Sequence, residues 1–301
     1  MTSEDQEEPL VAAATRSRKT VNQDAFAVVA PGHASLPAVV VADGLGSHYG
    51  AEAASDIAAR TIAEAIRDTP SAAALDLSSA FQAARCRIVR HVETLGDTLP
   101  PDLDRTQAFG TTAVCAVDGP DRLTLGYVGN GGLFHLRGNF NGFPKSQLLP
   151  WTALNYLNPH TVPEQGKNAM CKLVSPANGA ASAMPTVLTV SKDVDLFGDI
   201  VVCVTDGVYS YDQTPMGRDS EHRTWISGER SVALLFAALG TFFAGPEHTM
   251  DALAGCLEEF LVALDAENLM SDDCTVGVLV TEQALRYQAR RRSALAEATG
   301  A

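Results

Sequence analysis

Aspartate follows a β-branched apolar run at two distant places in the chain. Residues 39–42 (VVVA) lead into Asp43-Gly44, and residues 200–204 (IVVCV) lead through a threonine into Asp206-Gly207. A buried strand that stops at Asp-Gly places a carboxylate at the rim of a sheet, and the glycine leaves a main-chain carbonyl open to a ligand. Carboxylate and carbonyl oxygens are the ligands that hard divalent cations such as magnesium and manganese prefer.

Two further segments place carboxylates in front of a strand-like run. Asn22-Gln23-Asp24 precedes residues 25–29, and Asp272-Asp273 precedes residues 274–280. Any single Asp-Gly at a strand end is ordinarily only a turn. The repetition of the pattern favours a site that is assembled in space from distant segments.

A basic cluster and a histidine lie close to these segments in the sequence. Arg16, Arg18 and Lys19 stand just before Asn22, where a cation could meet an anionic substrate held at the metal; a solvated charge run is the alternative. His48 follows Gly44 by four residues and is either a general acid or, as the favoured interpretation, a loop or helix-start residue. His135 lies in the middle of an apolar strand and is predicted to be structural.

The composition describes an acidic chain with a sizeable core. The 301 residues carry a formal net charge of −14 with 46% hydrophobic residues, which predicts one domain and argues against nucleic acid as the main partner. The longest apolar run, 232–243, is too short to span a bilayer, and the acidic N-terminus shows no secretory signal, so we expect a cytoplasmic protein that contacts no membrane. The six cysteines include no C-x-x-C pair and are predicted to be reduced, buried small hydrophobic residues instead of zinc ligands or disulfides.

Hydrophobic periodicity predicts strands and paired helices between an N-terminal and a C-terminal tail. The predicted tails are a mobile acidic and alanine-rich segment, 1–15, and a basic segment, 283–301. The predicted helices are 51–68, 77–95, 229–243 and 248–265. The predicted strands are a hairpin of 26–29 and 38–42, a meander of 110–117, 123–128 and 133–137, and then 187–190, 200–204 and 275–280. Residues 138–186, rich in Asn, Pro, Gly and Ser, are predicted to form a flap-like insertion over the site or to be partly disordered.

Taken in order, these motifs, with Gly110-Thr111-Thr112 between them, resemble the metal-dependent type 2C protein phosphatases (PPM family), bacterial branch. The resemblance runs from about residue 16 to residue 281. It implies an α+β fold, a four-layer αββα sandwich of two antiparallel β-sheets flanked by helix pairs, in a phosphatase-like domain spanning 16–282. It also implies a site for two ions, manganese (Mn2+) or magnesium (Mg2+).

Matched residue by residue, the resemblance implies a role for each acidic position. Asp43 would bridge the two cations, the Gly44 carbonyl would bind one of them, and Asp206 and Asp272 would complete the other. Asp24 would hold a metal-bound water, which makes Asp24 and Asp43 the candidate catalytic residues. Two close cations lower the pKa of a bridging water and neutralise phosphoryl oxygens, so no protein nucleophile is required.

Three positions depart from the family pattern. Lys19 stands where the family has a phosphate-clamping arginine, and a lysine is a point charge instead of a bidentate fork, so Lys19 or Arg18 is the candidate phosphate ligand. Asn130 and Ser210 replace two acidic positions that help to bind a third cation in family members, which puts a third metal site in doubt.

The predicted function is hydrolysis of phosphoserine and phosphothreonine on proteins. The partners would be a phosphorylated protein substrate and, as a candidate, a serine/threonine kinase or its target. The first alternative is a catalytically weak or inactive pseudophosphatase that binds phosphoproteins or kinases as a regulator. The second is a hydrolase of small phosphate esters, which would share the metal site and differ in the insertion.

Overall fold

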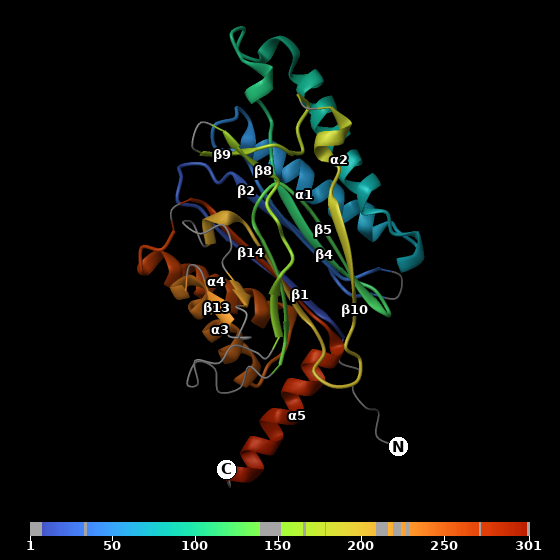
Figure 1. The fold of residues 1–301 in the computed structure, drawn as a ribbon, viewed down its shortest axis with the longest axis vertical. Helices are drawn as coiled ribbons and strands as arrows, with labels where there is room; N and C mark the ends of the chain where they lie inside the picture. Colours follow the sequence, from blue (N-terminus) through green and yellow to red (C-terminus); the bar gives the residue numbers. More distant parts are fainter. Residues whose placement is uncertain are drawn as a thin grey trace.

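The computed structural model describes the chain from residue 8 to residue 299, with short gaps (Figure 1). The described ranges are 8–32, 35–138, 152–164, 167–177, 179–208, 216–218, 224–226, 229–270 and 272–299.

Two five-stranded antiparallel sheets form the centre of the molecule. The first sheet has the strand order β1-β14-β11-β6-β7, and the second has the order β10-β5-β4-β3-β2. The strands of the first sheet are β1 (Leu10–Arg16), β14 (Cys274–Val280), β11 (Ile200–Val204), β6 (Gly132–Arg137) and β7 (Thr152–Asn155). Those of the second are β10 (Thr186–Ser191), β5 (Arg122–Val128), β4 (Ala113–Asp118), β3 (Ala38–Asp43) and β2 (Asp24–Val29). Two small ribbons pair β8 (Thr161–Glu164) with β9 (Lys167–Met170) and β12 (Met216–Arg218) with β13 (Thr224–Ile226).

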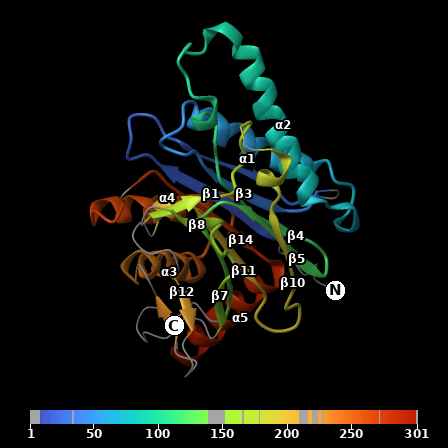
Figure 2. The same cartoon turned by 45° about the horizontal axis from the view of Figure 1, so that its top comes forward.

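A pair of helices covers the outer face of each sheet (Figures 1 and 2). The helices on the second sheet are α1 (Ala51–Arg67) and α2 (Leu77–Leu95), and those on the first are α3 (Glu229–Ala244) and α4 (Met250–Ala266). Side chains stabilise two of the N-termini: Asp76 accepts the Ser79 N–H at 3.2 Å, and Thr249 accepts the Ala252 N–H at 3.1 Å. The remaining helices are α5 (Glu282–Thr299) and the short 3-10 turns Ala72–Ala74, Gly96–Thr98, Arg105–Gln107, Ala180–Ala183 and Asp206–Val208.

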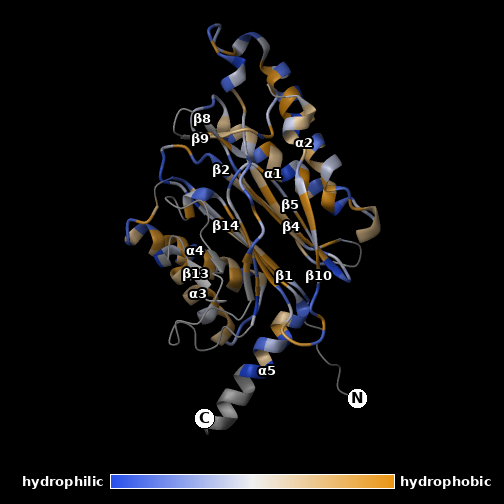
Figure 3. Ribbon diagram, viewed as in Figure 1, coloured by the Kyte–Doolittle hydropathy of each residue, from blue (hydrophilic) through white to orange (hydrophobic). Residues whose placement is uncertain are grey.

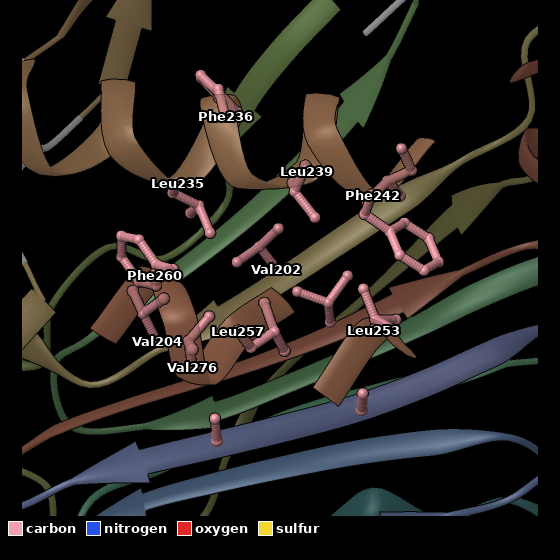
Figure 4. Packing of buried hydrophobic residues seen from close by; sticks show 14 of the residues in the cluster. Val202, Val204, Leu235, Phe236, Leu239, Phe242, Leu253, Leu257, Phe260 and Val276 are labelled. Carbon is pink, nitrogen blue, oxygen red and sulfur yellow. The ribbon is translucent and has the colours of Figure 1, made fainter. Parts of the chain in front are cut away.

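Three apolar layers hold these elements together. Val202 and Val276 on the first sheet meet Leu235 and Leu239 of α3 and Leu257 of α4 (Figure 4). A second layer lies between the sheets, and a third lies under α1 and α2. The strands between the helix layers are strongly apolar because their side chains form these layers (Figure 3). The predicted αββα arrangement of two antiparallel sheets and flanking helix pairs is confirmed.

The strand at the N-terminus corrects the predicted tail 1–15. Residues 10–16 form β1, which pairs with β14 along its whole length, from Leu10 opposite Val280 to Arg16 opposite Cys274. Val11 and Ala13 face the layer between the sheets, whereas Leu10, Ala12 and Ala14 face the helices. Because both faces are buried, the sequence shows no apolar–polar alternation, and its small side chains resemble a low-complexity tail.

The predicted meander is wrong at its third strand. β4 and β5 pair as expected, but β6 belongs to the other sheet and pairs with β11 and β7. Gly129 and Gly131 connect them with φ of 95° and 118°, a backbone region that side chains disfavour. The glycine-rich segment is therefore a crossing between sheets, although in sequence it reads as a hairpin turn.

The insertion and the C-terminal segment are more ordered than predicted. Residues 139–151 lie outside the described residues, but β7, β8 and β9 fall within 138–186, and β7 extends the first sheet. The flap role of the insertion stays a prediction. The segment 283–301 is not simply a solvated tail, because α5 packs its first turns on the protein: Leu285 is buried, and the Gln288 amide donates to the Gly138 carbonyl at 2.8 Å.

The predicted helices and the β2–β3 hairpin are confirmed. All six cysteines are free, and Cys115, Cys203 and Cys274 are buried as expected, whereas Cys86 and Cys171 are exposed.

The position of β1 between two apolar layers predicts a large effect of a charge at Val11, whose side chain is 1% exposed. Val11→Asp should lower the free energy of unfolding by at least about 3 kcal/mol, because it buries an unpaired carboxylate. Val187→Asp, on the edge strand β10 at 42% exposure, is the matched control and should cost less than about 1 kcal/mol. Urea unfolding measures both, and equal losses would contradict the placement of β1.

Candidate metal centre and phosphate site

Four aspartates from both sheets lie at one edge of the sandwich. Asp24 begins β2 and stands directly opposite Asp43, the last residue of β3. Asp206 follows β11 and Asp272 precedes β14, and these two strands are antiparallel neighbours with Val204 opposite Val276. The structure thus brings together the four carboxylates that the sequence analysis selected.

The carboxylates are close enough to perturb each other. Burial raises the pKa of Asp43 well above its usual value, and the charges of Asp24, Asp206 and Asp272 raise it further. A hydrogen bond with Asp206 also raises the pKa of Asp43. Burial also raises the pKa of Asp206, whereas the hydrogen bonds from Asp43 and Asn130 lower it. Positive charge therefore stabilises the cluster of carboxylates at this edge of the sandwich.

Asp24 is held by a threonine that the sequence analysis did not select. The Thr205 hydroxyl donates to Asp24 Oδ2 at 2.7 Å and itself accepts the Thr275 N–H at 2.9 Å. Asp24 is only 7% exposed, and burial raises its pKa to about 7 against the opposing effect of the hydrogen bonds. In the sequence, the position of Thr205 directly before Asp206, next to the strand end, is the feature that could have indicated its role.

The Gly-Thr-Thr motif supports the end of β3. The Asp43 carbonyl accepts from the Thr111 hydroxyl at 2.9 Å and from the Thr112 N–H at 2.8 Å. On the other side, the Gly44 N–H donates to the Gln23 carbonyl at 2.9 Å. These bonds fix the main chain on both sides of the Asp43 side chain.

Lys19, and not the side chain of Arg18, meets the carboxylates. Lys19 forms an ion pair with Asp272, and its ammonium donates to Gln23 Oε1 at 2.7 Å. Burial lowers the pKa of Lys19, but the hydrogen bond and charge of Asp272, together with Asp273 and Asp43, raise it overall. Arg18 contributes its main-chain N–H to Asp273 Oδ1 at 2.8 Å, while the residue itself is exposed.

Asp273 is a positioning residue whose role the sequence did not reveal. Its carboxylate is buried and accepts the main-chain N–H groups of Arg18, Lys19 and Gln23 and the hydroxyl of Ser17. Although burial raises the pKa of Asp273, these hydrogen bonds lower it overall, so the group is ionised. The sequence shows the Asp272-Asp273 pair, but only the fold shows that Asp272 faces Lys19 and that Asp273 holds the loop 18–23.

Asn130 lies beside the carboxylates at the position where the resemblance expects an acid. Its amide donates to Asp206 Oδ2 at 2.6 Å, so it supplies a hydrogen bond without adding a negative charge. Ser210 lies outside the described residues. The expectation that a third cation site is doubtful therefore stays a prediction.

Neither histidine singled out in the sequence faces the carboxylates through a described hydrogen bond. His48 packs against Gly110, where a Cβ would lie 2.3 Å from His48 Nδ1, and burial lowers the pKa of His48. His135 is buried, with Nε2 2.6 Å from Asp199 Oδ1, in keeping with the structural role predicted for it.

The donor set fits hard divalent cations in chemistry and charge. Asp43, Asp206 and Asp272 offer oxygen ligands, and the mutual repulsion of these carboxylates favours a cation beside them. Within the described ranges, no three His, Cys, Asp or Glu side chains already stand in metal-binding geometry. Asp272 is paired with Lys19, and Asp206 accepts a hydrogen bond from Asn130.

Comparisons with known proteins agree with this arrangement. Residues 12–147 match the family model described as protein phosphatase 2C. A bacterial serine phosphatase is 14% identical and covers 90% of this chain and 96% of its own, with a TM-score of 0.59. The catalytic domain of the serine/threonine protein phosphatase PstP, solved with two manganese ions, is 20% identical over 91% and 98%, with a TM-score of 0.57.

The serine/threonine phosphatase Stp1 from Staphylococcus aureus is 14% identical over 91% of this chain and 95% of its own, with a TM-score of 0.58. A search of curated proteins gave no match. The resemblance drawn from the motifs is confirmed: the chain has the fold of the type 2C protein phosphatases, and its N-terminal part matches their family model. In the part of the chain that the structure describes, no helix is both long and apolar enough to cross a membrane.

The raised pKa of Asp24 predicts a pH-dependent stability of the metal-free protein. Its pKa is about 7 in the folded chain against a usual value of 3.8, so between these pH values the folded state binds a proton that the unfolded state lacks. Stability should therefore fall as pH rises from about 4 to about 7. Asp24→Asn should flatten this slope by roughly 1.4 kcal/mol per pH unit. Urea unfolding in chelator across this range tests it, and identical slopes would contradict it.

The hydrogen bond from Thr205 predicts a second effect on Asp24. Thr205→Val removes the donor and should raise the Asp24 pKa by about one to two units, the worth of one hydrogen bond to a charged group. Thr205→Ser keeps the hydroxyl and should leave the pKa of Asp24 within about half a unit of its value in the parent protein. Carboxyl carbon NMR of the metal-free protein reads the midpoint directly. A midpoint unmoved in the valine variant would show that Thr205 does not hold Asp24.

Proposed function

We propose that this protein is a metal-dependent phosphatase that hydrolyses phosphoserine and phosphothreonine on proteins. The observation that carries the proposal is the convergence of Asp24, Asp43, Asp206 and Asp272 at one edge of the sandwich, with Lys19 beside them. Such a cluster of carboxylates suits a polyanionic substrate only when cations neutralise it. The two manganese ions of PstP support this assignment.

Each residue of the site has a task that its own chemistry allows. Asp43, Asp206 and Asp272 would hold the cations, and when bound the cations supply an activated water and neutralise phosphoryl oxygens. Asp24 would accept a hydrogen bond from the water that the cations activate and so orient it. Lys19 is the cation placed to orient the phosphate, as a point charge.

Asn130 favours a second candidate function. Its neutral amide on Asp206 occupies a position where the resemblance expects an acid, which would weaken a third cation site. A chain that keeps the fold and the first two cations but turns over slowly would act as a binding module for phosphoproteins. The two functions differ in turnover and not in fold, so a kinetic measurement separates them.

Removal of one cation ligand gives the decisive test. Purified protein with manganese should release phosphate from a phosphothreonine peptide, and excess chelator should abolish the release. Asp206→Asn and Asp43→Asn should each lower kcat/KM at least about 100-fold, because each removes a charge that holds the cations. Asp195→Asn, an exposed carboxylate outside the site, is the matched control and should be unchanged.

No turnover by folded, manganese-loaded protein, combined with measurable binding of the phosphopeptide, would contradict the phosphatase and support the binding module. Turnover that survives Asp206→Asn at the level of Asp195→Asn would show that the reaction takes place elsewhere.

A further inference from the structure

Three residues, Asp272, Gln23 and Gly46, surround the Lys19 ammonium. It forms the ion pair with Asp272 and donates to Gln23 Oε1 at 2.7 Å, with the charges of Asp43 and Asp273 nearby. The third side is Gly46, where a Cβ would lie 3.2 Å from both Lys19 Nζ and Gln23 Oε1. A larger residue at Gly46 would press on the ammonium, so the main chain leaves room for it.

The loop that carries Lys19 is fixed independently of the ion pair. Asp273 accepts the Lys19 N–H at 3.1 Å, the Arg18 N–H at 2.8 Å and the Gln23 N–H at 2.8 Å. These main-chain bonds set the direction in which the Lys19 side chain leaves the loop. The loop can therefore stay in place while the ammonium moves.

The ammonium and a divalent cation compete for the same oxygen. Lys19 contacts Asp272 Oδ1, and Asp272 is one of the ligands that the proposed function assigns to a cation. The side chains are 35% and 45% exposed, and exposed ion pairs of this kind are weak. Lys19 can thus leave Asp272 at small cost, and its long flexible stem lets the charge reach a new partner nearby.

We propose that Lys19 is an exchangeable internal cation. In the metal-free chain it neutralises Asp272, and when a divalent cation binds Asp272 it is released to the anion bound beside the site. One side chain then couples cation binding to phosphate binding. The phosphate half of this inference rests on the proposed function, whereas the competition for Asp272 does not.

Calorimetric titration of Mn2+ into the metal-free protein tests the competition. Lys19→Gln should bind Mn2+ tighter by about two- to fivefold, the value of an exposed ion pair converted to an affinity ratio. Lys19→Met, which can form no hydrogen bond to Asp272, should show the same gain. Arg18→Gln is the matched control: it removes one positive charge from the neighbouring residue, whose described contact with the carboxylates is through its main chain, and should stay within about 1.5-fold of the parent protein.

Equal gains for Lys19→Gln and Arg18→Gln would overturn the proposal, because simple repulsion between like charges would then explain both. Weaker Mn2+ binding by Lys19→Gln would also overturn it, because Lys19 would then be positioning Asp272 for the cation.

Titration of inorganic phosphate into the Mn2+-loaded protein tests the release. Lys19→Gln should bind phosphate at least about threefold more weakly although it binds Mn2+ more tightly, since charge-assisted contacts to phosphate are lost. A merely structural role would weaken both. Unchanged phosphate affinity would overturn the coupling. Both titrations are independent of turnover, so a failure of the phosphatase assay alone would count against the proposed function and leave this inference standing.

Discussion

Repulsion among closely spaced carboxylates is the constraint on which the functional edge of this protein depends. Asp24, Asp43 and Asp206 all have raised pKa values because they are withdrawn from water and face one another. A chain can tolerate this only if protons, a lysine or metal cations supply positive charge. The hydrogen bond between Asp43 and Asp206 and the ion pair of Lys19 with Asp272 are two such solutions, and divalent cations are a third.

The two-sheet sandwich supplies the rigidity that this crowding requires. Asp24 and Asp43 face each other because β2 and β3 are in register, and Asp206 and Asp272 flank neighbouring strands of the other sheet. Threonines complete the support: Thr111 and Thr112 bind the Asp43 carbonyl, and Thr205 binds Asp24. The apolar layers hold the strands together, and with them the strand ends that carry the aspartates.

The disagreements between sequence and structure share a physical origin. β1 has apolar residues on both faces, so its burial produces no alternation that could distinguish it from an alanine-rich tail. β6 follows a glycine-rich segment that resembles a hairpin turn, yet the positive φ angles of Gly129 and Gly131 carry the chain into the other sheet. In both cases the deciding contacts come from segments more than sixty residues away in sequence, β14 and β11.

The sequence alone determined the four acidic positions and the helices, because strand-end aspartates and helical stripes are local patterns that survive without tertiary context. The αββα fold was expected only from the resemblance of the ordered motifs to the type 2C phosphatases. Only the tertiary structure decided which groups each aspartate contacts. It shows that Asp273 binds the main chain of the loop, that Lys19 pairs with Asp272, that Arg18 contacts Asp273 through its main-chain N–H, and that Thr205 donates to Asp24. Side-chain direction and burial at a sheet edge arise from the packing of distant strands, and no local pattern encodes them.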